Sequence, residues 1–371
     1  MRKEASQSAD YFLLGCFAVW LGFGLIMLTS ASVAVAHENF GDKFFFIKRQ
    51  LLLGVLPGLC LFYIFAKVHY YWLKRVALPF FIFSLLLLLA VFIPGFGSDY
   101  GTQARSWLNI WGFSFQPAEF AKLALVVFIA AQLSEKGREI WDLKKGFLWP
   151  LGLGLIPIIL VILQPDIGTV SILFAILFSL LFIGGARLAH LFGLAAVGIA
   201  GLAAMIASAP YRAARFMTFL HPELDPQGVG YHINQALLAI GSGGVFGRGL
   251  GRSMQKFQYL PEVSADSIYA IIAEEMGLIF AVGLIILLVL IVQRGLRLVK
   301  NAPDQFSRLL AGGLIVWLVL QSFLNIGAMV GIMPLTGVPL PFVSHGGTAL
   351  MLGMAAVGIL INISKYVEEK N

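Results

Sequence analysis

One carboxylate, placed just before an apolar helical crossing, is the strongest candidate for chemistry in this sequence. Asp266 lies in YLPEVSADSIYAIIAEEMG (259–277), and the apolar run that follows it begins near Ile268. If that run crosses a membrane, Asp266 sits at the membrane–water boundary, where partial burial raises the pKa of a carboxyl group and suits it to act as a general base. Spacing alone favours a plainer alternative, in which Asp266 caps the helix.

Two more carboxylates, Glu274 and Glu275, follow about two helical turns later in the same motif. Charge buried at membrane depth is costly unless it is paired. We therefore expect one of them to face the interior of a helix bundle in a structural ion pair, with Arg212 or Arg215 as the partner.

Glu119 and Lys122 form a second charged pair inside an apolar run. Their spacing of three places them on one face of a helix. The favoured interpretation is a mutual ion pair that neutralises two buried charges. The alternative is that Glu119 holds Lys122 toward the anionic head group of a substrate.

The short motif QPDIGT (164–169) joins two apolar runs. An aspartate before a helix start caps free N–H groups, and this is the favoured role of Asp166. Gln164 and Asp166 are also substrate-binding candidates, since they lie at a surface where they could hydrogen-bond a ligand.

Several cations cluster in segments expected on one side of the membrane, namely Arg105, Arg212, Arg215, Arg248, Arg252 and Lys256. Guanidinium groups bind phosphate oxygens in pairs, so such a set suits a pyrophosphate. Arg105, Lys122, Arg212 and Arg215 are the phosphate-side candidates. For any single arginine, contact with anionic lipid is the plainer alternative.

No dedicated metal site is expected. The six histidines show no ligand spacing, and Cys16 and Cys60 both lie inside apolar runs. A divalent cation, Mg²⁺ or Mn²⁺, bridging pyrophosphate and carboxylate is left open.

The elements that position these residues are membrane helices. The chain of 371 residues is 59% hydrophobic and 12% charged, and its mean hydropathy is +0.88. This composition is typical of a membrane protein and leaves no stretch polar enough for a soluble domain. The net charge of +7 is therefore assigned to cytoplasmic loops and not to a nucleic-acid surface.

The sequence predicts an all-α integral membrane protein of about ten transmembrane helices, in one domain spanning 1–371. A crossing needs about 20 apolar residues. Candidate runs are 11–36, 50–66, 76–94, 117–134, 146–164, 167–185, 188–209, 276–293, and 309–364, which a Pro- and Gly-rich stretch at 331–347 divides in two.

Lysines and arginines set the expected orientation. Most fall in alternate loops, which places both termini in the cytoplasm. One large extracellular loop, 210–267, then connects helices 7 and 8. Within it, Ile233, Ala236, Leu237 and Ile240 have helical spacing, which predicts a short amphipathic helix at the outer leaflet.

Five motifs, in order along nearly the whole chain, resemble the SEDS family of shape, elongation, division and sporulation proteins, which includes FtsW, RodA and SpoVE. They are QPAEFAKL (116–123), QPDIGT (164–169), GVGYHINQALLAIGSGGVFGRGLG (228–251), the motif around Asp266, and LPFVSHGGTALM (340–351). Three residues depart from the family pattern: Ala265 and Ser267 beside the aspartate, and His345. The run GLGRSMQKFQYLPE (249–262) looks more like the division branch, FtsW, than like RodA.

The resemblance implies a peptidoglycan glycosyltransferase that polymerises lipid II, an undecaprenyl-pyrophosphate disaccharide pentapeptide, at the outer face of the cytoplasmic (inner) membrane. It implies septal cell-wall synthesis in cell division, a class B penicillin-binding protein as transpeptidase partner alongside other division proteins, and Asp266 as the essential acidic residue. The alternatives are a RodA-type elongation and cell-shape polymerase, a lipid II flippase, which would need charges at mid-depth as well, and a non-catalytic scaffold.

Overall fold

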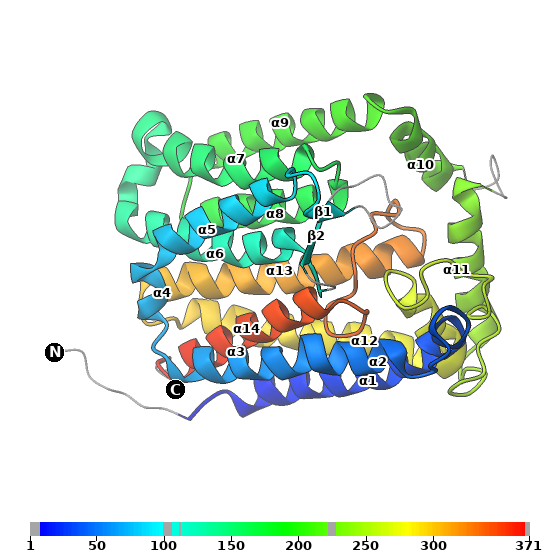
Figure 1. Ribbon diagram of the computed structural model, residues 1–371. Coiled ribbons are helices and arrows are strands. Elements are labelled where there is room, and N and C mark those ends of the chain that lie inside the picture. Colours follow the sequence, from blue (N-terminus) through cyan, green and yellow to red (C-terminus); the bar gives the residue numbers. More distant parts are fainter. Residues whose placement is uncertain (1–7, 99–105, 111–112, 222–227, 368–371) are drawn as a thin grey trace.

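The protein is almost entirely helical (Figure 1). The computed structural model describes residues 8–98, 106–110, 113–221 and 228–367. Its helices are α1 (Tyr11–Phe40), α2 (Phe45–Gln50), η1 (Leu51–Val55), α3 (Leu56–Lys67), α4 (Tyr71–Arg75), α5 (Ala77–Ala90), α6 (Pro117–Lys136), η2 (Gly137–Trp141), η3 (Leu143–Phe147), α7 (Leu148–Ile162), α8 (Ile167–Ile183), α9 (Leu188–Ala207), α10 (Pro210–Leu220), α11 (Val229–Gly243), α12 (Ile268–Lys300), α13 (Gln305–Met329) and α14 (Gly347–Ser364).

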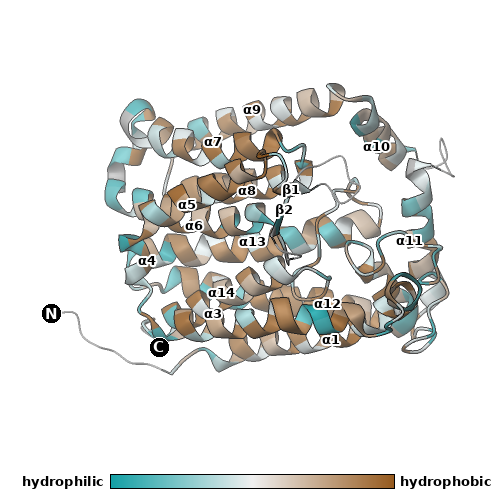
Figure 2. Ribbon diagram, viewed as in Figure 1, coloured by the Kyte–Doolittle hydropathy of each residue, from teal (hydrophilic) through white to brown (hydrophobic). Residues whose placement is uncertain are grey.

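Seven of the described helical segments are long and apolar enough to cross a membrane: α1, the continuous α2–η1–α3 segment, α6, α9, α12, α13 and α14. Three shorter apolar helices, α5, α7 and α8, accompany them. All ten lie on the apolar runs predicted from the sequence. Hydrophobic residues cover the helices on their outward faces as well as inside (Figure 2), as expected for helices surrounded by lipid. The chain is therefore a multi-pass membrane protein.

The long helices run side by side, with an enclosed centre and an open rim (Figure 1). α6 and α14 are the most enclosed, α13 nearly as much, whereas α9 is mostly exposed along one edge. The charge-bearing helix α6 therefore lies in the middle of the bundle, where unpaired charge would be most costly.

The two ends of the bundle differ. At one end the start of α1 meets the end of α14, because the Asp10 amide donates to Ser364 Oγ at 3.0 Å, and Lys365 Nζ donates to the Ala66 carbonyl at 2.7 Å. The other end carries α10, α11 and the loop 244–267 (Figure 1). The amphipathic helix predicted around Ile233 is confirmed as α11.

A small antiparallel sheet, which the sequence did not predict, lies between α5 and α6. It consists of β1 (Gly97–Ser98), β2 (Trp107–Ile110) and β3 (Phe113–Phe115), in the order β1-β2-β3. These strands are too short for a two-residue periodicity to stand out in the sequence.

Candidate functional site

Asp266 lies at the end of the loop 244–267, immediately before α12. The N-cap residue of α12 is Ser267, which makes no side-chain capping bond. The capping role considered for Asp266 is therefore wrong, and another constraint must hold this residue in place.

That constraint acts on the backbone. Three consecutive carbonyls accept hydrogen bonds from the segment around α13 and α14. The His345 amide donates to the Ser264 carbonyl at 2.7 Å, Ser344 Oγ donates to the Ala265 carbonyl, and Asn325 Nδ2 of α13 donates to the Asp266 carbonyl at 2.8 Å. We call Asn325, Ser344 and His345 the carbonyl bracket. The bracket fixes the peptide before α12 through its carbonyls alone and takes no bond from the Asp266 carboxyl group.

The carbonyl bracket is itself anchored. The second Nδ2 proton of Asn325 goes to the Val338 carbonyl at 2.8 Å. The side chain of Gln50 donates to the Ser344 carbonyl at 3.2 Å and accepts from the Gly346 amide at 3.0 Å. Segments far apart in sequence thus converge on Asp266.

A histidine holds the other side of the turn. Ser267 Oγ donates its one proton to the Pro261 carbonyl at 2.6 Å, so His232 Nε2, 2.6 Å from the same oxygen, must carry the proton that it shares. Burial, together with the nearby charge of Arg215, lowers the pKa of His232 to about 4. His232 is therefore a neutral donor at physiological pH.

The carboxyl group of Asp266 is poised between its two protonation states. Burial and the negative charge of Glu262 raise its pKa to about 6, against smaller lowering effects from its own backbone and from Arg215. Oδ2 lies beside Gly337, where an added Cβ would be 3.9 Å away. Asp266 is itself only partly buried, and near neutral pH its ionised carboxylate can accept a proton.

Of the predicted phosphate-side arginines, the structure brings Arg215 toward Asp266. Arg215 donates to the Leu335 carbonyl at 3.5 Å, and its charge acts on Asp266. Arg212 instead bonds to Tyr211 Oη at 2.8 Å and to the Met205 carbonyl at 3.2 Å, at the corner between α9 and α10. Arg105 lies outside the described residues.

Glu274 and Glu275 do form ion pairs, but the expected partners are wrong. Glu275 pairs with Lys256 at 2.8 Å and Glu274 with Arg248 at 3.5 Å, whereas Arg212 and Arg215 lie on α10. The nearer cations come from the loop that folds back on the first turns of α12.

Both carboxylates also accept backbone donors from that loop. Gly251 N donates to Glu275 at 3.0 Å and Met254 N donates to Glu274 at 2.9 Å. Ser30 Oγ of α1 also donates to Glu275. We call Glu274 and Glu275 with these donors the carboxylate clamp. Because both carboxylates are fully buried and their oxygens are occupied by donors, the clamp serves structure.

Glu119 and Lys122 form the expected ion pair, with Nζ 2.7 Å from Glu119 Oε1. Lys122 is 0% exposed, and its Nζ also donates to Gln321 Oε1 at 2.7 Å. Gln321 in turn donates to the Pro339 carbonyl at 3.0 Å. Lys122 does not reach the surface, so this arrangement supports the ion pair and not contact with a head group.

The QPDIGT motif serves the helix start. Asp166 accepts from the Thr169 amide at 3.0 Å and caps α8. Gln164 is 1% exposed and donates to the Leu88 carbonyl at 3.0 Å. The predicted capping role of Asp166 is confirmed. The buried side chain of Gln164 links the end of α7 to α5 and is closed to solvent.

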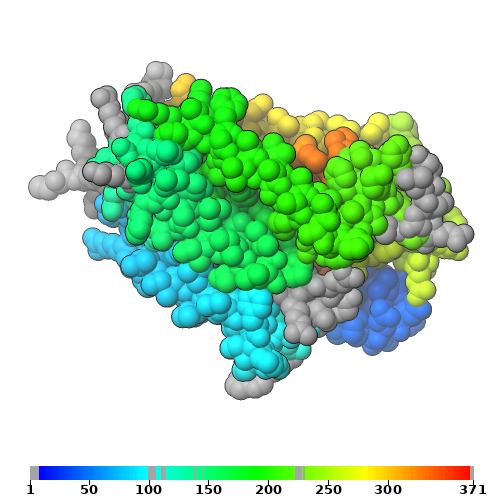
Figure 3. Space-filling model, turned by 90° about the horizontal axis from the view of Figure 1, so that it is seen from above, coloured from blue at the N-terminus to red at the C-terminus, as the bar shows by residue number. Residues whose placement is uncertain are grey.

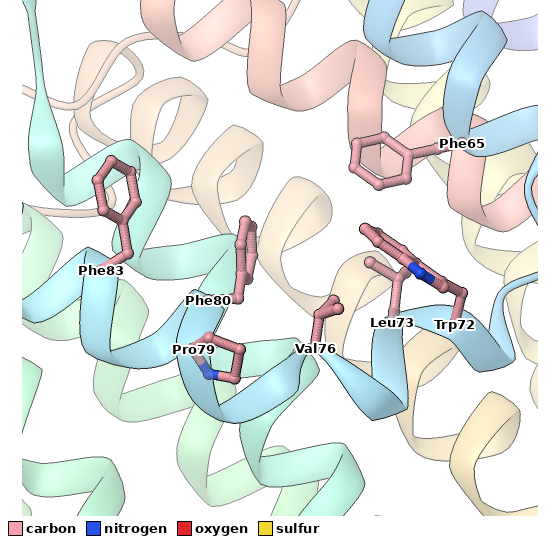
Figure 4. A pocket seen from close by; sticks show the side chains of 7 residues that line it. All are labelled: Phe65, Trp72, Leu73, Val76, Pro79, Phe80 and Phe83. Atoms are coloured by element: carbon pink, nitrogen blue, oxygen red, sulfur yellow. The ribbon is translucent and has the colours of Figure 1, made fainter.

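An apolar pocket of about 380 Å³ lies between α3, α4 and α5. Figure 4 shows a row of side chains along α4 and α5, with Phe65 of α3 opposite one end of it; the lining residues are Phe65, Trp72, Leu73, Val76, Pro79, Phe80 and Phe83. The lining offers aliphatic and aromatic surface but no group for catalysis, and α4 lies at the opposite end of the bundle from α11 (Figure 1).

Among the residues that the structure describes, no group of three or more His, Cys, Asp or Glu side chains comes together to hold a metal ion.

The sequence alone locates the motifs that form the site, but it does not predict the contacts between them. Asn325, His232 and Gln50 were not singled out. The sequence shows the motif at 340–351 but does not predict its contact with residues 264–266, because no local sequence pattern indicates which distant segments pair.

Comparison with known proteins gives one consistent answer. A sequence profile of the family of FtsW, RodA and SpoVE, described as "Cell cycle protein", matches residues 10–369. Stage V sporulation protein E of Bacillus subtilis (strain 168) is 40% identical over 359 residues, covering 97% of this chain and 98% of that protein. A protein named "Probable peptidoglycan glycosyltransferase FtsW", from Trichlorobacter lovleyi, is 38% identical and covers 96% and 93%.

Solved structures agree. A chain from a structure titled "Structural coordination of polymerization and crosslinking by a peptidoglycan synthase complex" matches with a TM-score of 0.80 at 27% identity, covering 98% of this chain and 99% of that chain. The crystal structure of the rod shape determining protein RodA of Thermus thermophilus matches with a TM-score of 0.71 at 27% identity, covering 98% of each chain. The chain belongs to the family of FtsW, RodA and SpoVE cell cycle proteins.

Proposed function

We propose that this protein is a peptidoglycan glycosyltransferase that polymerises lipid II at the outer face of the cytoplasmic membrane, with Asp266 as general base. The observation that carries the proposal is the half-buried Asp266 carboxyl group with its raised pKa, held near Arg215 by a bracket that bonds only to backbone carbonyls. Relatives that carry this activity in their names match over nearly the full chain.

The reaction joins the 4-hydroxyl of one GlcNAc to the anomeric carbon of the growing strand's MurNAc. Asp266 takes the hydroxyl proton as the oxygen attacks. The bond from that carbon to the phosphate oxygen breaks, and its electron pair leaves with the lipid diphosphate. Direct displacement inverts an α-linked donor into a β-linked glycan.

The departing diphosphate needs positive charge nearby. Arg215 is the cation best supported by its position, because it acts on both Asp266 and His232. Arg212 is one turn along α10 and is a second candidate, and Arg105 remains a third from the sequence. Lys122 is left out of this set because it is buried in its own ion pair.

We place the end that carries Lys67, Arg297 and Lys365 in the cytoplasm by the positive-inside rule, and both termini with it. With one crossing for each of the seven long and three shorter apolar helices, the proposed chain crosses ten times. The segment 210–267, with α10, α11 and Asp266, then faces the outside.

Division is the role we favour, since the run 249–262 resembles the FtsW branch. A class B penicillin-binding protein fits as the transpeptidase partner, because a solved relative comes from a structure titled as a peptidoglycan synthase complex.

The decisive experiment uses the purified protein in lipid vesicles with lipid II, alone and with a cognate transpeptidase, and resolves the products on a gel. Polymerisation predicts a ladder of glycan strands. Lipid II that changes leaflet without forming strands would support a flippase instead and overturn the proposal.

A further inference from the structure

The loop 244–257, which joins α11 to the turn before Asp266, exposes a cluster of large apolar side chains. Phe246 is 82% exposed, and Val245, Leu250, Met254 and Phe257 are each more than half exposed. Exposed apolar patches of this kind mark contact with a lipid or protein surface.

The loop is nevertheless held rigidly. The carboxylate clamp binds it at Gly251, Met254 and Lys256. Its apolar side chains are therefore presented in fixed positions, and cannot fold back to bury themselves.

The backbone of the loop is hydrogen-bonded to α12. The Leu278 amide donates to the Gly244 carbonyl at 2.9 Å, and the Ile279 amide donates to the Val245 carbonyl at 3.4 Å. An added Cβ on Gly277 would lie 2.5 Å from the Val245 carbonyl. The loop backbone thus runs directly against α12 at the point where that helix turns outward.

From that point α12 faces lipid. Leu278, Ile279 and Phe280 are about half exposed, and α12 has the highest hydropathy of the candidate spans. The uncharged run 276–293 ends before Arg294. At ~1.5 Å per residue this run is ~27 Å long, close to the ~30 Å hydrocarbon core. Leu278 therefore lies at the outer edge of the hydrocarbon, and Phe246 lies at the same level.

We infer that the loop 244–257 is seated in the outer leaflet of the bilayer, with Phe246 as its deepest side chain, continuing the lipid-facing surface of α12. Arg252, which is exposed, extends from the same loop toward the phosphate groups, whereas the guanidinium of Arg248 is turned inward to Glu274. Seated in this way, the loop fixes the depth of the Asp266 turn relative to the membrane surface, where a lipid-linked substrate presents its head group.

The test is a depth measurement on the full-length chain alone in lipid bilayers. A nitroxide label is placed at Phe246→Cys in a Cys16→Ala, Cys60→Ser background, and collisions with oxygen, which concentrates in lipid, are compared with collisions with a water-soluble nickel chelate. The lipid reference is Ile286→Cys, on the exposed face of α12, and the water reference is Glu139→Cys, an exposed residue of the short helix η2.

We expect oxygen to dominate at 246 as it does at 286, with labels at 250 and 254 shallower. Because Phe246 is mostly exposed, the label leaves the fold intact, which equal melting temperatures check. Dominance of the nickel chelate at 246 would overturn the inference. So would a label shielded from both reagents, since that indicates a protein contact. Neither result bears on polymerisation by Asp266, which the lipid II gel tests separately.

Discussion

Two acidic regions flank the start of α12, and they use burial in opposite ways. In the carboxylate clamp, Glu274 and Glu275 are 0% exposed and are surrounded by donors from the loop that they bind. A few residues earlier, Asp266 is held by its backbone while its side chain is left to burial and to the like charge of Glu262. A buried carboxylate that is surrounded by hydrogen-bond donors and cations stabilises the fold. A buried carboxylate with few such partners has a raised pKa and is suited to act as a general base.

The largest expected effect is the loss of folding stability when a clamp carboxylate is removed. Glu275→Ala leaves the buried Lys256 without its counter-charge, and removal of one partner from a buried pair costs about 3–5 kcal/mol. We expect a strong drop in melting temperature in detergent. Glu262→Ala, an exposed acidic residue in the same loop region, is the matched control and should melt within about 0.5 kcal/mol of the wild type. Equal melting of the two variants would contradict the clamp.

Asn325→Ala tests whether the carbonyl bracket positions Asp266, because it leaves the carboxyl group itself in place. The change removes two donors, to the Asp266 and Val338 carbonyls, and each lost bond to a buried carbonyl costs about 1–3 kcal/mol. Since small misplacements at a reacting centre are costly, we expect lipid II polymerisation to fall by about 10- to 100-fold in protein that is still folded. Ser322→Ala, one turn away on α13, should keep its rate. Full activity in Asn325→Ala would show that the bracket does not position the base.

Arg215→Gln should lower the rate and move the pH profile. The positive charge lowers the pKa of Asp266, so its removal raises that pKa, and the acidic limb of the rate shifts to higher pH. Loss of one phosphate-side cation is expected to reduce turnover by about tenfold. Arg252→Gln, on the loop 244–257, should not move the limb. An unmoved limb in Arg215→Gln would remove Arg215 from the neighbourhood of the base.

Glu262→Gln has the smallest expected effect and the opposite sign. The negative charge of Glu262 raises the pKa of Asp266. Without it, Asp266 ionises at lower pH and the acidic limb moves down from about pH 6, with little change in the plateau rate. A shift upward would reverse the assigned electrostatics.

The fold was largely readable from the sequence because lipid demands long apolar runs, and the ten apolar helices lie on the ten predicted runs. The largest difference is at α12, which begins at Ile268, before the uncharged run 276–293. Local motifs also located Asp266, the cap on Asp166 and the pair of Glu119 with Lys122. The carbonyl bracket was not predictable, because Asn325 lies 59 positions from Asp266 and its role depends on how α13 packs. For the same reason the partners of Glu274 and Glu275 were misassigned.

The most direct test of the account is Asp266→Asn, assayed for lipid II polymerisation with the melting temperature measured on the same sample. Loss of a general base predicts a fall of about 10²- to 10⁴-fold. The folded pKa of Asp266 lies above its ordinary value, so its ionised form lowers stability as pH rises from about 4 to 6; the variant should therefore melt no lower than the wild type at pH 7. Polymerisation at the wild-type rate would contradict the account.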